Sequence, residues 1–92
     1  MKFMMTFRWK PNTAERGEAI ARFQKTGGKP PEGAKLLGRW TKADLSGGFD
    51  LLETDDPKLL AEFASMWSDL MELSIVPVLE DQELSEVFQK IK

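Results

Sequence analysis

Two arginines and three tryptophans are the residues of this sequence best suited to hold a small molecule. Arg8 and Trp9 are adjacent, as are Arg39 and Trp40, and Trp67 is the third tryptophan. Indole rings form flat apolar walls, and a guanidinium can hold a carboxylate or phenolate. These five residues are therefore the candidate ligand-binding residues, provided that the fold brings them together.

Catalysis would require a general base beside those rings. Asp69 and Glu72 are the candidates, because burial among tryptophans would raise the pKa of a carboxyl group. The sequence contains no histidine and no cysteine, which excludes a thiolate nucleophile, a Ser–His relay, a zinc finger and a histidine-ligated haem. We expect no metal and no cofactor.

The same residues also allow a purely structural interpretation. Tryptophans are good core residues, and an arginine facing a carboxylate on the next strand often forms an ordinary ion pair. The expected pairs are Arg8 with Glu72, Arg39 with Asp50, and Lys35 with Glu53. Ligand binding and structural pairing both remain open at this point.

Length and charge restrict the class of protein. Ninety-two residues predict a single domain over 1–92, and a net charge of −2 without a basic run argues against a nucleic-acid partner. The apolar start, residues 1–7, is too short for a signal-peptide core or a membrane span. We expect a cytoplasmic protein with no membrane partner.

Hydrophobic patterning and turn residues predict four strands and three helices. The first helix begins at Asn12 or Thr13, with Glu15 completing a capping box, and Gly27-Gly28 ends it. Asp56-Pro57 starts the second helix and Asp81 caps the third. The predicted strands span 2–9, 34–41, 49–54 and 71–79, with a hairpin loop over 42–48.

This order, β-α-β-β-α-β plus a C-terminal helix, predicts an α+β ferredoxin-like fold. Its four-stranded antiparallel sheet has the spatial order 4-1-3-2, which puts Pro77 on an edge strand, where a missing amide donor is tolerated. The ends of the first two strands then lie beside the starts of the last two. The five candidate binding residues would meet at that end.

Both faces of the predicted sheet carry large apolar residues. In the first strand, Met4 lies on the opposite face from Phe3. In the second strand, Leu37 lies on one face, and Leu36 and Trp40 lie on the other. Two helices cover one face only, so we expect a second copy to cover the other and to form a dimeric α/β barrel. The alternative is that the C-terminal helix folds back over the open face.

Four segments carry a family resemblance: MKFMMTFRWKP, PPEGAKLLGRW, GGFDLLETDDP and MWSDLMELSIVPVLEDQE. They resemble, in order and spacing, the small bacterial proteins grouped as domain of unknown function 3303. The resemblance implies a ferredoxin-like subunit of the dimeric α/β-barrel superfamily and no particular activity. That superfamily includes haem-degrading enzymes, but the absence of histidine argues against haem binding by this chain.

The favoured function is a homodimer that binds a small aromatic or acidic molecule near the barrel mouth. One alternative is a cofactor-independent oxygenase or isomerase, which needs a carboxylate of raised pKa in the pocket. Another is a purely structural interaction module, whose interior would be filled by side chains. We lean against an enzyme.

Overall fold

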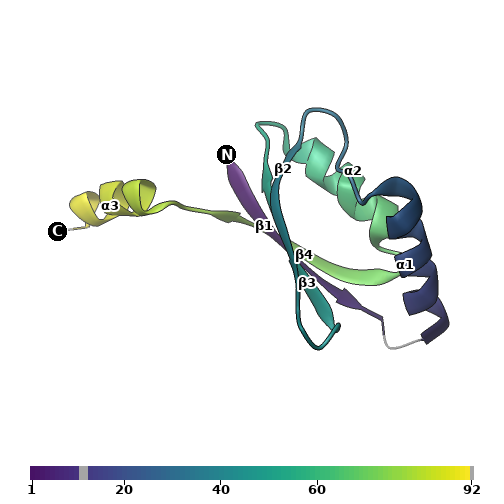
Figure 1. The fold of residues 1–92 in the computed structure, drawn as a ribbon. Coiled ribbons are helices and arrows are strands. Elements are labelled where there is room, and N and C mark those ends of the chain that lie inside the picture. The colour runs from purple at the N-terminus through teal and green to yellow at the C-terminus, as the bar shows by residue number, and fades with distance from the viewer. Residues whose placement is uncertain (11–12, 92) are drawn as a thin grey trace.

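The computed structural model describes residues 1–10 and 13–91 and has the predicted order of elements (Figure 1). The elements are β1 Lys2–Trp9, α1 Thr13–Thr26, β2 Lys35–Thr41, β3 Gly47–Glu53, α2 Pro57–Trp67, β4 Met71–Val78 and α3 Asp81–Lys90. The cap predicted at Asn12 or Thr13, with Glu15, lies outside the described residues and side chains. None of the described helices has the length and apolar character needed to cross a membrane.

The strands form one antiparallel sheet in the order β2-β3-β1-β4, with α1 and α2 on one face (Figure 1). The ferredoxin-like prediction is therefore confirmed. Pro77 lies on the edge strand β4 opposite Phe3, as predicted. Lys35 lies opposite Glu53, but their side chains do not form the predicted ion pair. We call the surface toward α1 and α2 the helix side of the sheet, and the other surface the open side.

Side chains alternate between the two sides of the sheet along each strand, and those on the helix side form the core. Phe3, Met5 and Phe7 of β1 are buried there. Leu60, Phe63 and Trp67 pack from α2 at helical spacing. The predicted start of α2 is confirmed, because the carboxylate of Asp56 accepts a 3.0 Å hydrogen bond from the Lys58 amide and Pro57 follows.

The β2–β3 hairpin differs from the prediction at Gly47 and Gly48, which belong to strand β3 and not to the loop. The backbones of neighbouring strands approach both glycines closely. A β-carbon on Gly47 would lie 2.0 Å from the carbonyl oxygen of Phe7, and one on Gly48 would lie 2.2 Å from that of Trp40. Only glycine fits a ladder this tight.

A β-bulge in β2 overturns the predicted faces of that strand. Leu36 pairs with Leu52, but Gly38 pairs with Leu51, so Leu37 is one residue extra. Such an insertion inverts the alternation beyond it. The prediction that Leu36 and Trp40 share a face is therefore wrong, since Leu36 lies on the helix side and Trp40 on the open side.

The last helix, α3, stands clear of the rest of the chain (Figure 1). None of its residues is buried, so the alternative in which it folds back over the open side is wrong. Its N-cap is Glu80 and not Asp81 as predicted, because the Glu83 carboxylate reaches back to accept a 3.0 Å hydrogen bond from the Glu80 amide.

Candidate ligand-binding site

A cavity of about 230 Å³ lies between the helix side of the sheet and the helices α1 and α2. Its walls are mostly apolar and aromatic, with two arginines and one carboxylate among them. The lining residues are Met5, Phe7, Trp9, Arg16, Ile20, Phe23, Gly28, Arg39, Thr41, Leu45, Asp50, Phe63, Trp67, Met71 and Leu73. The cavity thus lies inside a single subunit, on the helix side of the sheet, and not near the mouth of a barrel on the open side as expected.

Three of the five predicted binding residues line this cavity. Trp9 and Arg39 reach it from the helix side of the sheet, and Trp67 reaches it from the end of α2. Arg8 and Trp40 are exposed on the open side, because each is adjacent in its strand to a residue that faces the helices. The three tryptophans share one end of the sheet but not one face.

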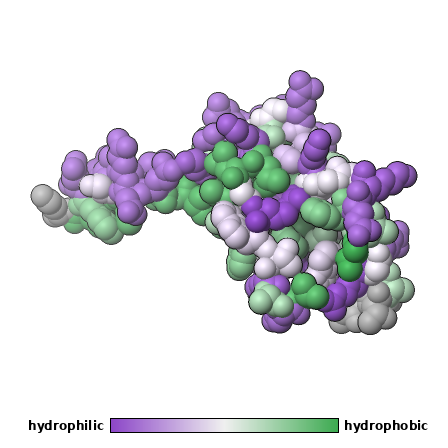
Figure 2. Space-filling view, viewed as in Figure 1, coloured by the Kyte–Doolittle hydropathy of each residue, from purple (hydrophilic) through white to green (hydrophobic). Residues whose placement is uncertain are grey.

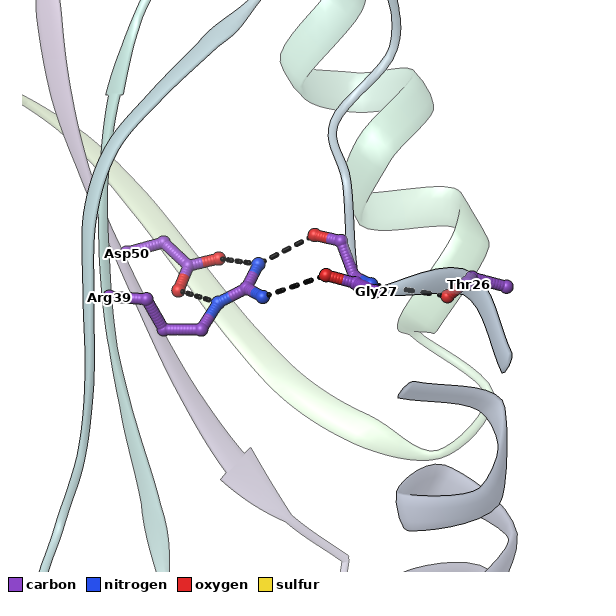
Figure 3. A network of polar contacts seen from close by, with 5 residues as sticks. Thr26, Gly27, Arg39 and Asp50 are labelled. Atoms are coloured by element: carbon purple, nitrogen blue, oxygen red, sulfur yellow. Dashed lines mark hydrogen bonds and ion pairs between the residues drawn. The ribbon is translucent and has the colours of Figure 1, made fainter. Parts of the chain in front are cut away.

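Arg39 and Asp50 form the polar centre of the cavity wall (Figure 3). The Arg39 guanidinium donates to both carboxylate oxygens of Asp50, over 2.7 and 3.0 Å. It also donates to the carbonyls of Gly28, at 2.6 Å, and Gly27, at 3.3 Å, so it ties β2 to the end of α1. The predicted ion pair is confirmed, and the Asp50 side chain is only 1% exposed.

The two carboxylates predicted as candidate bases lie elsewhere. Asp69 follows α2 and accepts two hydrogen bonds from Arg22, of 3.0 and 2.9 Å. These bonds hold the pKa of Asp69 below its usual value, whereas a general base in this position requires a raised pKa. Glu72 is exposed on the open side and forms the predicted ion pair with Arg8.

Arg22 also fastens α1 to the end of α2. Its guanidinium donates to the Met66 carbonyl over 2.7 Å and lies 5.5 Å from the centre of the Trp67 ring. The hydrogen-bonded Asp69 raises the pKa of Arg22, so the charge is permanent. One wall of the cavity is therefore held in place by charged contacts between helices.

Comparison with known protein families shows a match over the whole chain. The family model described as "Domain of unknown function (DUF3303)" matches residues 1–92. The chain belongs to the DUF3303 family. A search of curated proteins found no match.

A search of the solved structures found a protein whose fold is similar to that of this DUF3303 chain. It is similar to Rv0793 from Mycobacterium tuberculosis, with 11% identity and a TM-score of 0.54. The alignment covers 88% of the DUF3303 chain and 98% of that chain. At this identity the likeness shows the ferredoxin-like fold alone.

Sequence reasoning missed the contribution of α1 to the DUF3303 cavity. Arg16, Ile20 and Phe23 line it, and their i, i+4, i+7 spacing puts them on one helix face. Ile20 and Phe23 are large apolar residues, yet they are 45% and 43% exposed. The helix stands away from the sheet at this point, and the space beneath it is the cavity.

The hydrogen-bond partners of Arg16 differ from those of Arg39, the other arginine in the cavity wall. Its guanidinium donates a 3.0 Å hydrogen bond to the Leu45 carbonyl in the β2–β3 hairpin. Within residues 1–10 and 13–91, leaving aside the side chains of Thr13 and Glu15, it meets no carboxylate at ion-pair distance. Arg16 therefore brings a positive charge to the wall of the cavity.

Proposed function

We propose that the chain binds a small aromatic molecule carrying an acidic group, in the cavity between the sheet and α1 and α2. The observation that carries the proposal is the aromatic cavity with Arg16 in its wall. A cavity of about 150 Å³ holds a benzene ring, so about 230 Å³ suits one substituted ring. The ring would lie among Trp9, Phe63 and Trp67.

Arg16 is the better anchor for the acidic group. Arg39 already spends its donors on Asp50 and on the carbonyls of Gly27 and Gly28, so a ligand would have to displace a buried ion pair to use it. Among the described residues and side chains, Arg16 has one carbonyl contact, which leaves further N–H donors of its guanidinium for a ligand. A ligand carboxylate would form charge-assisted hydrogen bonds with it.

Binding is favoured over catalysis by the charges around the cavity. Asp50 is the one carboxylate among the described lining residues, and Arg39 occupies both of its oxygens. Asp69 and Glu72, the candidate bases, are engaged by arginines away from the cavity. A cofactor-independent oxygenase or isomerase is therefore the second candidate. A purely structural module, for which we expected an interior filled by side chains, is the third, because the cavity argues against it.

The test is a fluorescence titration with substituted benzoates, since two tryptophans line the cavity. We expect saturable quenching in the natural protein and binding at least about 10-fold weaker in Arg16→Gln, the loss of one charged contact. Arg8→Gln is the matched control, because Arg8 lies on the open side, and it should bind as the natural protein does. No response to any benzoate, or equal binding by Arg16→Gln, overturns the proposal.

We also infer that two copies associate through the open side of the sheet. Trp40 is 56% exposed there and Val76 is 49% exposed, with Met4, Phe49 and Leu51 between them. A continuous apolar sheet face of this kind is usually an interface. Sedimentation equilibrium at micromolar concentration tests it, and a folded monomer would overturn it.

A cytoplasmic bacterial protein is our expectation for this homodimer. The cysteine-free sequence suits a reducing compartment, and the structure it is similar to comes from a bacterium. Fractionation of cells that express the natural gene would test the location.

A further inference from the structure

Helix α3 has an apolar face that none of the described residues of its own chain covers. Leu84, Val87, Phe88 and Ile91 share one face, and their exposed fractions run from 37% to 71%. Isolated helices shorter than about 12–15 residues are only marginally stable in water. A helix of 10 residues without a buried side chain therefore needs a surface to pack against.

The position of α3 indicates what supplies that surface. It lies beyond the end of β4, on the side of the sheet away from α1 and α2 (Figure 1). Apolar atoms run along one side of this arm toward the body, and polar atoms run along the other (Figure 2). Val76, which is 49% exposed, and Val78 lie on the open side of β4 and continue the apolar surface from the sheet toward α3.

The exit of the arm is fixed by an ion pair. The Lys2 ammonium contacts the carboxylate of Glu80, which directly precedes α3. Lys2 also lies opposite Val78, the last residue of β4. The arm thus leaves from the end of the sheet where β1 begins and β4 ends.

We propose that α3 of each copy packs on the β2 edge of a second copy, around Leu37. This rests on the proposed homodimer through the open side. A two-fold axis parallel to the strands places β4 of one copy over β2 of the other. β2 begins at the end of the sheet where β4 finishes, because Lys35 and Lys2 both lie opposite Glu53 and Lys2 lies opposite Val78.

The β2 edge has the chemistry that α3 would meet. Leu37, the extra residue of the bulge, is 37% exposed, and Lys35 beside it is also exposed. Glu83, directly before Leu84, borders the apolar face of α3, and its charge complements that of Lys35. β2 is an edge strand, and covering such an edge with a helix blocks unwanted strand pairing.

Engineered cysteines test this placement directly, since the chain has none of its own. The variant Leu37→Cys/Phe88→Cys places one thiol on the β2 edge and one on the apolar face of α3. Leu37→Cys/Glu86→Cys is the matched control, with its second thiol on the polar face of the same helix. Each variant is oxidised mildly, run on a non-reducing gel and also sedimented in reduced form, with circular dichroism to verify folding.

We expect a covalent dimer in the first variant, at a rate at least about 10-fold above the control. A reduced protein that sediments as a dimer but cross-links no faster than the control would overturn the placement of α3 and leave the homodimer standing. A folded monomer in sedimentation would overturn both. The two failures are therefore distinguishable.

Discussion

The guanidinium of Arg39 on β2 holds both carboxylate oxygens of Asp50 on β3, with the Asp50 side chain only 1% exposed. Arg39 also reaches two carbonyls at the end of α1. This pair therefore joins the sheet to the helix that forms the far wall of the cavity. Its removal leaves one buried charge without a partner, which is far more costly than the loss of an exposed pair.

We predict that Asp50→Asn lowers the free energy of unfolding by about 3 kcal/mol, because the buried Arg39 loses its counter-charge. Urea denaturation measures this. Glu72→Gln is the matched control on the same sheet, since the Arg8–Glu72 pair is exposed. It should cost less than about 1 kcal/mol. Equal losses in the two variants would contradict the structural role of Asp50.

Filling the cavity should block ligand binding without unfolding the protein. Leu73→Trp adds volume from β4 toward the space beneath α1, and we expect at least about a 10-fold loss of benzoate affinity. The free energy of unfolding should change by less than about 1.5 kcal/mol, because the new ring enters empty space. Calorimetric titration measures the affinity. Val76→Trp, on the open side of the same strand, should bind as the natural protein does.

The ion pair of Arg22 and Asp69 predicts an acid-sensitive contribution to stability. Arg22 lowers the pKa of Asp69 in the folded state, so the pair stabilises the fold above the usual aspartate pKa. That contribution is lost as the pH falls through the lowered value. Thermal unfolding of the natural protein and of Asp69→Asn should therefore differ at neutral pH and converge as the pH falls below the usual aspartate pKa. A difference that is constant over this range would contradict the assignment.

A charge on the open side should separate the two copies. We expect Val76→Lys to weaken dimerisation by at least about 10-fold, because a lysine would be buried in an apolar interface. Met66→Lys is the control, since Met66 is 43% exposed on α2, away from the open side. It should leave the sedimentation profile unchanged. A Val76→Lys protein that is still as dimeric as the natural chain would place the interface elsewhere.

Two glycines should respond to alanine in opposite ways. A β-carbon on Gly47 would lie 2.0 Å from the Phe7 carbonyl oxygen, so Gly47→Ala must displace a strand and should cost more than about 2 kcal/mol. Gly17 lies inside α1, with nothing within 4 Å of an added β-carbon. Gly17→Ala should stabilise the protein by up to about 1 kcal/mol. Urea denaturation of both variants provides the comparison.

The sheet order and every element could be predicted from local sequence patterns. The alternation of a strand, the helix start at Pro57 and the edge-strand position of Pro77 each depend on residues that are close together in the sequence. The face of Trp40 could not be predicted in the same way. It depends on the bulge at Leu37, which is set by how β2 pairs with β3, and one extra residue there exchanges the faces of Arg39 and Trp40. The place of α3 could not be predicted either, because the sequence does not say which surface a helix will cover.

Only part of the candidate site could be predicted from the sequence, because the rest depends on how α1 packs against the sheet. Trp9, Arg39 and Trp67 were identified by residue type and topology. Arg16 and Phe23 were missed, because an apolar helix stripe predicts close packing and gives no sign that the helix stands off the sheet. The distance between α1 and the sheet is set by side chains on three elements at once.

Adjacent residues on β1 and β2 serve opposite surfaces of one sheet, as Trp9 does beside Arg8 and Arg39 beside Trp40. A substitution at one of these four positions therefore changes either the wall of the cavity or the open side of the sheet, and not both.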